Sequence, residues 1–323
     1  MSMPSPLAAA DRAVLVDTVA KAPAVSPPLA SMLADASSLV RPRIALMVLA
    51  TVVAAVWLTV GGAFDSGRLL GLLLGTALVA ASSSITNQIL ERDTDRLMPR
   101  TARRPIAAGR MSVPTAVVLA SVTLSAGVII TTLSAGWQPA GAAIATWLVY
   151  VIVYTPMKQR TPLNTAVGAV AGALPVAIGW LAAGGPALLQ AGDASAALTA
   201  AALGTVLYLW QFPHFMAIAW LYRVQYAQAG LRMLTVDDPT GLRAAGQSLV
   251  AALAMVPVSL VLAVPSGSIR LFLAAAVASI GYCGAAVRFA IRRDDASARV
   301  LLLVSLGSLL ALLTAAVMFG QPR

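Results

Sequence analysis

Long apolar stretches recur along the chain, separated by short segments that hold most of the charged residues. About 20 apolar residues in a helix cross the roughly 30 Å hydrocarbon core of a bilayer. Helix is required in each stretch because lipid offers no partner to an unpaired backbone group. The pattern therefore predicts an all-α, polytopic membrane helical bundle of nine spans, near residues 44–63, 69–90, 113–133, 137–156, 163–183, 196–221, 246–264, 270–289 and 298–319.

The composition supports a membrane protein over a soluble one. Of the 323 residues, 59% are hydrophobic and 11% are charged, whereas soluble domains carry roughly a quarter charged residues. The net charge of +10 would suit a nucleic-acid binder, but the cytoplasmic loops of membrane proteins also collect Lys and Arg. We therefore expect no nucleic-acid partner. The single cysteine, Cys283, cannot form an internal disulfide.

The basic residues alternate between the two sides of the membrane in step with the predicted spans. The amino-terminal segment and every second loop after it hold all Lys and Arg except Arg68, Arg270 and Arg323. Basic loops stay in the cytoplasm. The pattern predicts a multi-pass protein with its amino terminus in the cytoplasm and its carboxyl terminus outside, and we expect it in the bacterial cytoplasmic (inner) membrane.

The first 40 residues differ from the rest in composition. They are rich in Ser, Pro and Ala, and they lack the apolar core of about 7–15 residues that a signal peptide needs. Asp11, Asp17 and Asp35 are unusual in a transit peptide, which is poor in acids. We expect a flexible cytoplasmic tail over 1–40 and one membrane domain over 41–323.

Oxygen donors gather at the end of the second predicted span. Glu91, Asp93 and Asp95 are three of only 12 acidic residues in the chain. Residues four apart share one helix face, so Asn87, Glu91 and Asp95 form a stripe, with Asp93 on the other side unless the helix unwinds. Mg²⁺ prefers oxygen ligands and bridges them to phosphates. The alternative is a solvated helix end whose acids pair with the arginines that follow them.

Basic residues lie on the same predicted side as these acids. The loop after the second span contains Arg103, the loop after the fourth contains Lys158 and Arg160, and the loop after the sixth contains Arg223 and Arg232. Arg binds phosphate oxygens in a bidentate manner. Acids and cations together would suit a diphosphate whose hydrocarbon tail lies in the bilayer, although the arginines alone would signal only orientation.

The sixth span ends in an aromatic segment that contains Pro213 and the only histidine, His214. A lone histidine beside an apolar helix is more often a hydrogen-bonded core residue than a ligand. A proline frees a backbone carbonyl, which favours a nearby site, whereas the aromatic residues are equally typical of a membrane-interface belt.

Four segments carry a resemblance to a known family, namely residues 41–43 (Arg-Pro-Arg), 87–105, 154–164 and 210–234. They resemble the UbiA-type intramembrane prenyltransferases, and specifically the protohaem IX farnesyltransferase branch of that family. The last segment is the most specific, and the resemblance extends over about 41–320. It implies nine helices around a central cavity capped by cytoplasmic loops.

The resemblance also implies an activity. Members of this branch transfer a farnesyl group from farnesyl diphosphate to a vinyl group of haem B, giving haem O, with Mg²⁺. Matching positions imply a catalytic metal site of Asn87, Glu91 and Asp95 supported by Asp93, and diphosphate binding by Lys158 and Arg160. To these we add Arg103 for the diphosphate and Arg223 and Arg232 for the haem propionates. His214 falls in a Pro-His pair of the family and is expected to face haem, and an aromatic residue is expected to face the farnesyl cation: Tyr154, Tyr208 or Trp210.

Two positions depart from the family pattern. Glu91 stands where the family usually has aspartate, and Gln225 replaces an acid before Tyr226. A glutamine offers a carbonyl oxygen but no charge, so a second metal site would be weaker, built differently or helped by Asp237 or Asp238.

The expected partners are haem, an isoprenoid diphosphate, the bilayer, and haem A synthase or oxidase assembly proteins.

Other interpretations of the sequence remain open. The acceptor is alternatively a quinone precursor, chlorophyllide or a glycerol-based lipid. A transporter would place ionisable groups near the middle of the membrane, whereas here they gather at one face. A non-catalytic assembly protein for respiratory complexes would leave the acidic stripe without a role.

Overall fold

The structure is a computed structural model that describes residues 29–320. The expected tail lies outside the described residues over 1–28, but Leu29–Val40 form the helix α2 and are not irregular. Residues from Ser37 onward belong to one compact unit, and the description below concerns that unit.

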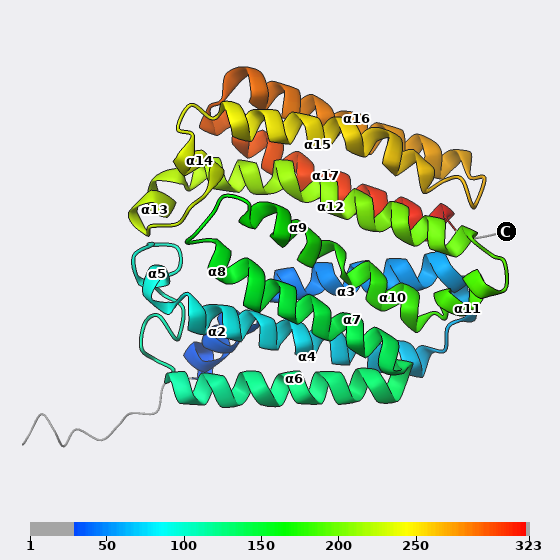
Figure 1. The fold of residues 1–323 in the computed structure, drawn as a ribbon, viewed down its shortest axis with the longest axis horizontal. Coiled ribbons are helices and arrows are strands. Elements are labelled where there is room, and N and C mark those ends of the chain that lie inside the picture. The colour runs from blue at the N-terminus through cyan, green and yellow to red at the C-terminus, as the bar shows by residue number, and fades with distance from the viewer. Residues whose placement is uncertain (1–28, 321–323) are drawn as a thin grey trace, which may run out of the picture. The chain divides into compact units, whose positions relative to one another are not determined.

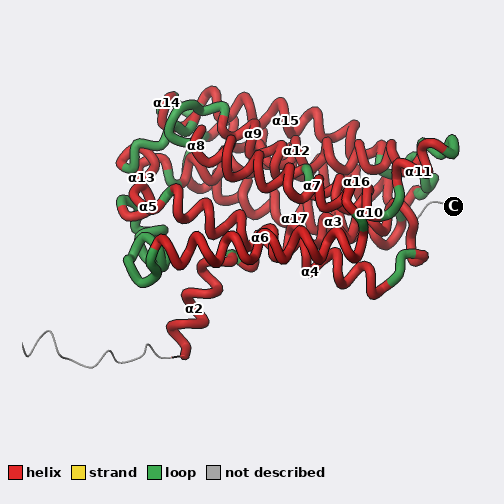
Figure 2. Tube along the Cα trace, turned by 60° about the horizontal axis from the view of Figure 1, so that its bottom comes forward, coloured by secondary structure: helices red, strands yellow, loops and turns green. Residues whose placement is uncertain are grey.

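Helices account for all of the regular structure between residues 37 and 320 (Figures 1 and 2). Within the described residues, nine are long and apolar enough to cross a membrane, which confirms the nine predicted spans. They are α3 (Pro42–Val60), α4 (Ser66–Leu90), α6 (Val113–Ala135), α7 (Trp137–Leu148) with η2 (Val149–Tyr154) and α8 (Thr155–Met157), α9 (Asn164–Ala173) with α10 (Pro175–Ala182), α12 (Ser195–Leu221), α15 (Leu242–Val261), α16 (Ile269–Arg292) and α17 (Asp295–Phe319).

Short helices occupy the connections. They are η1 (Gly61–Ala63), α5 (Arg92–Arg96), α11 (Gly185–Gln190), α13 (Arg223–Gln228) and α14 (Leu234–Asp237). The fifth span divides into α9 and α10 immediately before Pro175, which cannot donate a helical hydrogen bond. The sixth span continues through Pro213 without a break, so this proline does not end the helix.

The spans pack side by side, with α3 and α12 between two groups of helices (Figure 1). On one side, α15, α16 and α17 pack against one another and against α12. On the other side, α4 packs along α6, and α7 joins α6 to α10. The largest buried cluster lies between α12 and α15–α17, where Leu203, Met255, Tyr282 and Phe289 are completely or almost completely buried.

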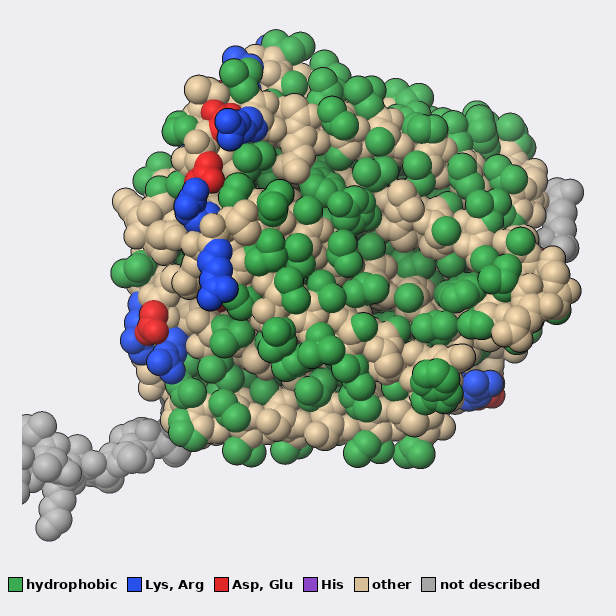
Figure 3. Space-filling model, in the orientation of Figure 1, with side chains coloured by type: hydrophobic (Ala, Val, Ile, Leu, Met, Phe, Trp, Pro, Cys, Tyr) green, Lys and Arg blue, Asp and Glu red, His purple; other side chains and the backbone are tan. Residues whose placement is uncertain are grey.

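The outer surface separates into an apolar flank and a charged end. Large hydrophobic side chains such as Leu70, Leu133, Val277 and Ile291 are more than half exposed along the spans. Figure 3 shows Lys, Arg, Asp and Glu gathered mainly at the end of the unit where α5, α13 and α14 lie. A flank of this kind requires an apolar solvent, so the protein is a multi-pass membrane protein.

The helices α4 and α6 approach each other closely at two glycines. A Cβ atom on Gly127 would lie 2.8 Å from the carbonyl oxygen of Gly75, and one on Gly75 would lie 2.8 Å from that of Gly127. Ser82 of α4 also donates a 2.8 Å hydrogen bond to the carbonyl of Ala120 on α6. Small residues permit such backbone approach between membrane helices, and this contact fixes the helix that carries the acidic stripe.

We expect Gly127→Leu to lower the thermal unfolding midpoint of the detergent-purified protein, because overpacking costs about 1–3 kcal/mol. Gly141→Leu is the matched control, since a Cβ there meets no atom within 4 Å and both changes gain the same helix propensity. Equal midpoints for the two variants would show that the α4–α6 contact is not tight.

Candidate active site

The end of α4 directs three oxygen donors to one side. The helix stops at Leu90, Glu91 adopts φ −95° and ψ 5°, and α5 begins at Arg92. Asn87, Glu91 and Asp95 are 0%, 8% and 1% exposed. Asp93 lies on the other side with a 72% exposed side chain, paired with arginines on either side of it. The stripe is therefore buried as a group of three, and the structure does not bring Asp93 into it.

Glu91 is neutralised by a lysine from the loop after the fourth span. Lys158 Nζ donates to Glu91 Oε1 at 2.7 Å and lies 4.5 Å from the centre of the Tyr154 ring. Burial alone would raise the pKa of Glu91, but the positive charges of Lys158, Arg41 and Arg104 together hold the pKa below its usual range. The same pairing overcomes burial at Lys158 and raises the pKa of that ammonium. Both groups are charged at neutral pH.

Asp95 is neutralised by Arg104. The guanidinium Nη1 lies 2.8 Å and 2.6 Å from the two oxygens of Asp95, and 3.9 Å from Glu91 Oε2. Burial and the nearby Glu91 carboxylate raise the pKa of Asp95, and together they exceed the lowering by Arg104 and Arg41. The two carboxylates are thus close enough to repel each other, a repulsion that a further cation would relieve.

A third cation, Arg41, points at the same cluster. It precedes α3 with φ 52°, a conformation that is uncommon for a residue other than glycine. Its Nη1 donates to the Tyr150 hydroxyl at 3.5 Å, while its Nη2 is buried without a hydrogen-bond partner among the described residues. The charge of Arg41 contributes to the lowered pKa of both Glu91 and Arg104. A buried donor without a partner costs free energy, which a bound anion that accepts a hydrogen bond from this guanidinium would recover.

Asn87 supplies an oxygen without a partner. Its Nδ2 donates to Thr155 Oγ1 at 3.1 Å, and that hydroxyl in turn donates to the carbonyl of Tyr150 at 2.9 Å. These hydrogen bonds leave Asn87 Oδ1 buried and without a partner among residues 29–320. Within residues 29–320, no three His, Cys, Asp or Glu side chains converge as metal ligands. The candidate site therefore has two carboxylates and one amide oxygen, a donor set that fits Mg²⁺ when substrate phosphates complete its shell.

Three connecting loops meet over this cluster. The backbone N–H of Arg232 donates to the carbonyl of Lys158 at 2.7 Å, and Asn164 Nδ2 donates to the carbonyl of Arg232 at 2.9 Å. Arg100 lies 4.6 Å from the centre of the Tyr222 ring and donates to the Tyr226 hydroxyl at 3.2 Å. The predicted cap of cytoplasmic loops thus corresponds to contacts among the segments 91–112, 158–163 and 222–241.

Two of the residues predicted to bind diphosphate lie elsewhere. The side chains of Arg103 and Arg160 are exposed, whereas Lys158 is inside the cluster. Arg104, the neighbour of Arg103, takes the inner position because the turn after α5 directs it to Asp95. Consecutive arginines gave no sequence signal for which one faces inward.

The residues predicted to bind haem each have a partner of their own. His214 Nδ1 lies 2.8 Å from Ser305 Oγ, and its ring stacks on Trp210. Arg223 pairs with Asp295 of α17 at 2.8 Å, and Arg232 pairs with Asp237 at 3.0 Å. The structure therefore does not gather these three side chains, and their role toward haem stays a prediction.

Sequence reasoning missed Arg41, Arg104, Tyr150 and Thr155 as parts of the site. The position of Arg41 immediately before Pro42 and the first span was a usable signal, because it places a cation at the same membrane face as the acids. Among the aromatic residues considered, Tyr154 lies beside Lys158, while Trp210 donates to the carbonyl of Ser305.

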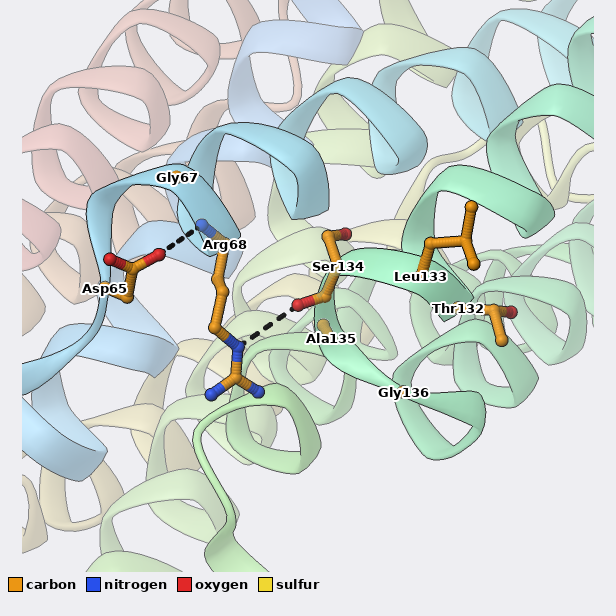
Figure 4. Close-up of a pocket in the computed structure, with 8 residues that line it drawn as sticks. All are labelled: Asp65, Gly67, Arg68, Thr132, Leu133, Ser134, Ala135 and Gly136. Atoms are coloured by element: carbon orange, nitrogen blue, oxygen red, sulfur yellow. Dashed lines mark hydrogen bonds between the residues drawn. The ribbon is translucent and has the colours of Figure 1, made fainter.

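A pocket of about 610 Å³ lies at the other end of α4 (Figure 4). It contains Asp65 and Arg68, and Arg68 Nε donates to the carbonyl of Ser134 at 3.1 Å. The 25-residue length of α4 separates this pocket from Glu91 by roughly 37 Å. One acid and one cation do not reproduce the donor set at Glu91, so the candidate active site is the buried cluster.

Known proteins resemble this chain in sequence and fold. A model of the UbiA prenyltransferase family matches residues 48–319. Protoheme IX farnesyltransferase of Rhodopirellula baltica is 49% identical over 70% of this chain and 76% of its own length. The protein of that name from Solibacter usitatus is 36% identical over 84% of this chain and 93% of its own length.

A solved structure has the same fold at low identity. A UbiA homologue from Archaeoglobus fulgidus, bound to GPP and Mg²⁺, superposes with a TM-score of 0.57 at 17% identity, covering 87% of this chain and 99% of its own. The match over residues 48–319, together with relatives above 30% identity, establishes that the chain belongs to the UbiA prenyltransferase family.

Proposed function

We propose that the protein transfers a farnesyl group from farnesyl diphosphate to a vinyl group of protohaem IX, giving haem O and diphosphate. One observation carries the proposal: Asn87, Glu91 and Asp95 are buried on one face and opposed by Lys158 and Arg104. Relatives at 49% and 36% identity, both named protoheme IX farnesyltransferase, support haem as the acceptor.

The donor set assigns the metal ligands. Asn87 Oδ1, Glu91 and Asp95 would hold Mg²⁺, as the unpaired amide oxygen indicates. When bound, Mg²⁺ supplies positive charge to the oxygens of the leaving diphosphate. Asp93 is left out of this assignment because its side chain lies on the opposite face.

The cations of the cluster would also bind the diphosphate. Lys158 and Arg104 neutralise the carboxylates in the structure as it stands, and Arg41 keeps an unpaired Nη2. With a metal on the carboxylates, Lys158 and Arg104 are free to exchange partners and bind phosphate oxygens, joined by Arg41. Charge-assisted hydrogen bonds of this kind stabilise the diphosphate as negative charge builds up on it.

The bond between farnesyl C1 and the diphosphate oxygen breaks, and its electron pair leaves with the diphosphate. The terminal carbon of the haem vinyl group bonds to the allylic C1 atom. Water adds to the resulting cationic carbon next to the porphyrin ring and loses a proton, which gives the hydroxyethylfarnesyl group. Of the aromatic residues considered, Tyr154 lies beside Lys158 and would present its ring to the farnesyl cation, and aromatic faces stabilise cations.

The proposed setting is the inner leaflet of a bacterial cytoplasmic membrane. The charged end that carries α5, α13 and α14 (Figure 3) would face the cytoplasm under the positive-inside rule, with the carboxyl terminus outside. A farnesyl chain would then lie among the spans while its diphosphate meets the cluster.

Purified protein in detergent should convert haem B and farnesyl diphosphate to haem O when Mg²⁺ is present. Chelation by EDTA should abolish turnover, and added Mg²⁺ should restore it. Product is identified by mass spectrometry. A verified homologue serves as the positive control, and product from it with none from this protein would refute haem as the acceptor. Turnover of another acceptor would then identify a different branch of the family.

Asp95→Asn should lower kcat on the order of 10³-fold, because it removes one of two carboxylates that would hold the metal. The matched control is Asp93→Asn, which makes the same chemical change two residues away on the exposed face and should leave kcat within about threefold. Thermal unfolding of each variant checks the fold. Similar kcat values for the two would remove the acidic stripe from the mechanism.

Arg104→Gln should lower kcat/KM for farnesyl diphosphate by about 10²-fold or more, as loss of an oxyanion contact does. Arg103→Gln, at the exposed neighbouring position, should change it little. Because a broken buried ion pair also destabilises a fold, Arg104→Lys provides a second variant that retains the charge and should keep intermediate activity. A larger loss in Arg103→Gln would reverse the assignment.

A further inference from the structure

The pocket at the start of α4, at the far end of that helix from Glu91, holds two opposite charges that are not paired with each other (Figure 4). Arg68 Nε donates to the carbonyl of Ser134 at 3.1 Å, and Asp65 Oδ1 accepts the backbone N–H of Arg68 at 2.8 Å. Neither the guanidinium nor the carboxylate forms an ion pair with any residue in the described range 29–320. Both charged groups are therefore available to a ligand.

The pocket is large enough for one small ligand to reach both groups. Its volume of about 610 Å³ falls within the roughly 300–1,000 Å³ of small-molecule sites. Figure 4 shows Asp65 and Ser134 on opposite sides of the Arg68 side chain, and the hydrogen bond to Ser134 fixes that side chain against α6. A ligand in the pocket would thus meet a guanidinium that is already positioned.

The pocket lies at the depth of lipid headgroups. Because α4 begins at Ser66 and α6 ends at Ala135, two membrane spans terminate there. Trp137, the first residue of the next span, is exposed, which is typical of tryptophan at a membrane–water interface. Arg68 lies outside the loops that collect most of the basic residues, so orientation signalling does not explain its presence.

An apolar stripe on α6 leads from the pocket along the bilayer. Leu133, which lines the pocket, is more than half exposed, and so are Ile129 and Val122. Residues at this spacing share one helix face. The stripe from Leu133 to Val122 is about 16 Å long at 1.5 Å per residue, close to half of the roughly 30 Å hydrocarbon core. It is therefore long enough to contact an acyl chain of one leaflet.

The two charges select the headgroup. Arg binds phosphate oxygens in a bidentate manner, but a phosphate alone would leave the Asp65 carboxylate beside a like charge. A primary ammonium that is joined to the phosphate by two carbons would donate hydrogen bonds to that carboxylate. A quaternary ammonium, as in choline, has no N–H group to donate.

We propose that this pocket binds a phospholipid with an ethanolamine headgroup, with its phosphate on Arg68, its ammonium on Asp65 and an acyl chain on the α6 stripe. The site lies at the opposite end of α4 from the acidic cluster, so it is separate from the candidate active site. The proposal goes beyond farnesyl transfer and stands whether or not haem is the acceptor.

The test is a competition among lipids for the full-length protein, purified in detergent and stripped of lipid. Phosphatidylethanolamine, phosphatidylglycerol and phosphatidylcholine with identical dioleoyl chains are added in equal amounts, and native mass spectrometry counts the bound lipids. We expect the ethanolamine lipid to exceed each of the others by about fivefold, the upper end for an exposed ion pair. Equal occupancy, or an excess of either other lipid, would overturn the proposal.

Free phosphoethanolamine identifies the source of the headgroup. This molecule has both charges and lacks the chains, so we expect it not to displace the lipid at equal concentration. Displacement at equal concentration would show that the pocket binds a soluble compound and would overturn the assignment to a lipid.

Arg68→Gln should lower the occupancy by the ethanolamine lipid about fivefold. The matched control is Arg270→Gln, which makes the same change at an exposed arginine on the same membrane face, at the start of α16, and should change the occupancy less than about twofold. Thermal unfolding in detergent checks the fold of each variant. An equal loss in both variants would show that any arginine at this face suffices, which contradicts a defined site.

Asp65→Asn tests the ammonium contact independently of Arg68. Asparagine caps a helix as well as aspartate does, so α4 should begin as before while the charge is lost. We expect this variant to bind the ethanolamine and glycerol lipids equally. Asp193→Asn, which changes an exposed acid that accepts the backbone N–H of Ser195 at 2.9 Å on the same membrane face, should retain the preference. A preference that survives in Asp65→Asn would refute the role of Asp65.

Discussion

The site depends on two carboxylates held out of water at the end of a membrane helix. Glu91 and Asp95 are at most 8% exposed, and isolated charges in such surroundings would cost several kcal/mol each. Direct ion pairs with Lys158 and Arg104 offset this desolvation cost. Ion pairs of this kind contribute little to net stability, because desolvation offsets much of the attraction. Their presence at one membrane face, in a chain with only 12 acids, therefore points to a function in binding charge.

The same pairs connect the cap to the bundle. Lys158 contacts Glu91 through its side chain and Arg232 through its carbonyl oxygen, so the loop after the fourth span joins the acids of the second to the segment after the sixth. Arg100 adds a link from the second loop to Tyr226. If Lys158 exchanged Glu91 for another partner, its backbone contact with Arg232 would transmit the movement to the segment that carries Gln225. Under the proposed function, diphosphate binding would therefore be coupled to the position of the cap through this lysine.

Hydropathy and helix periodicity were sufficient to predict the nine spans and the shared helix face of the acidic stripe. Both depend on local geometry: a span needs about 20 apolar residues, and positions 87, 91 and 95 share a face in any helix. Selecting Arg104 over Arg103 needed the direction of an irregular turn, which periodicity does not give. The position of Arg41 before the first span was a sequence signal for its membrane face, but its contact with Tyr150 joins residues 109 positions apart, which local geometry does not predict. The helix over Leu29–Val40 was missed because it lacks the length and apolarity of a span.

The unpaired atoms and the ion pairs belong to one site. Such a site can bind charged molecules without leaving a buried charge uncompensated. Glu91 and Asp95 each have a cation, while Asn87 Oδ1 and Arg41 Nη2 have no hydrogen-bond partner within the part of the chain that the structure describes. These two atoms have opposite preferences, one for a cation and the other for an anion. A metal–diphosphate pair, as proposed, would satisfy both at once, and it would let Lys158 and Arg104 move from carboxylate to phosphate oxygens. If cation and anion arrive together, the buried group would change partners while its total charge stays near balance, which a low-dielectric site at the membrane surface requires.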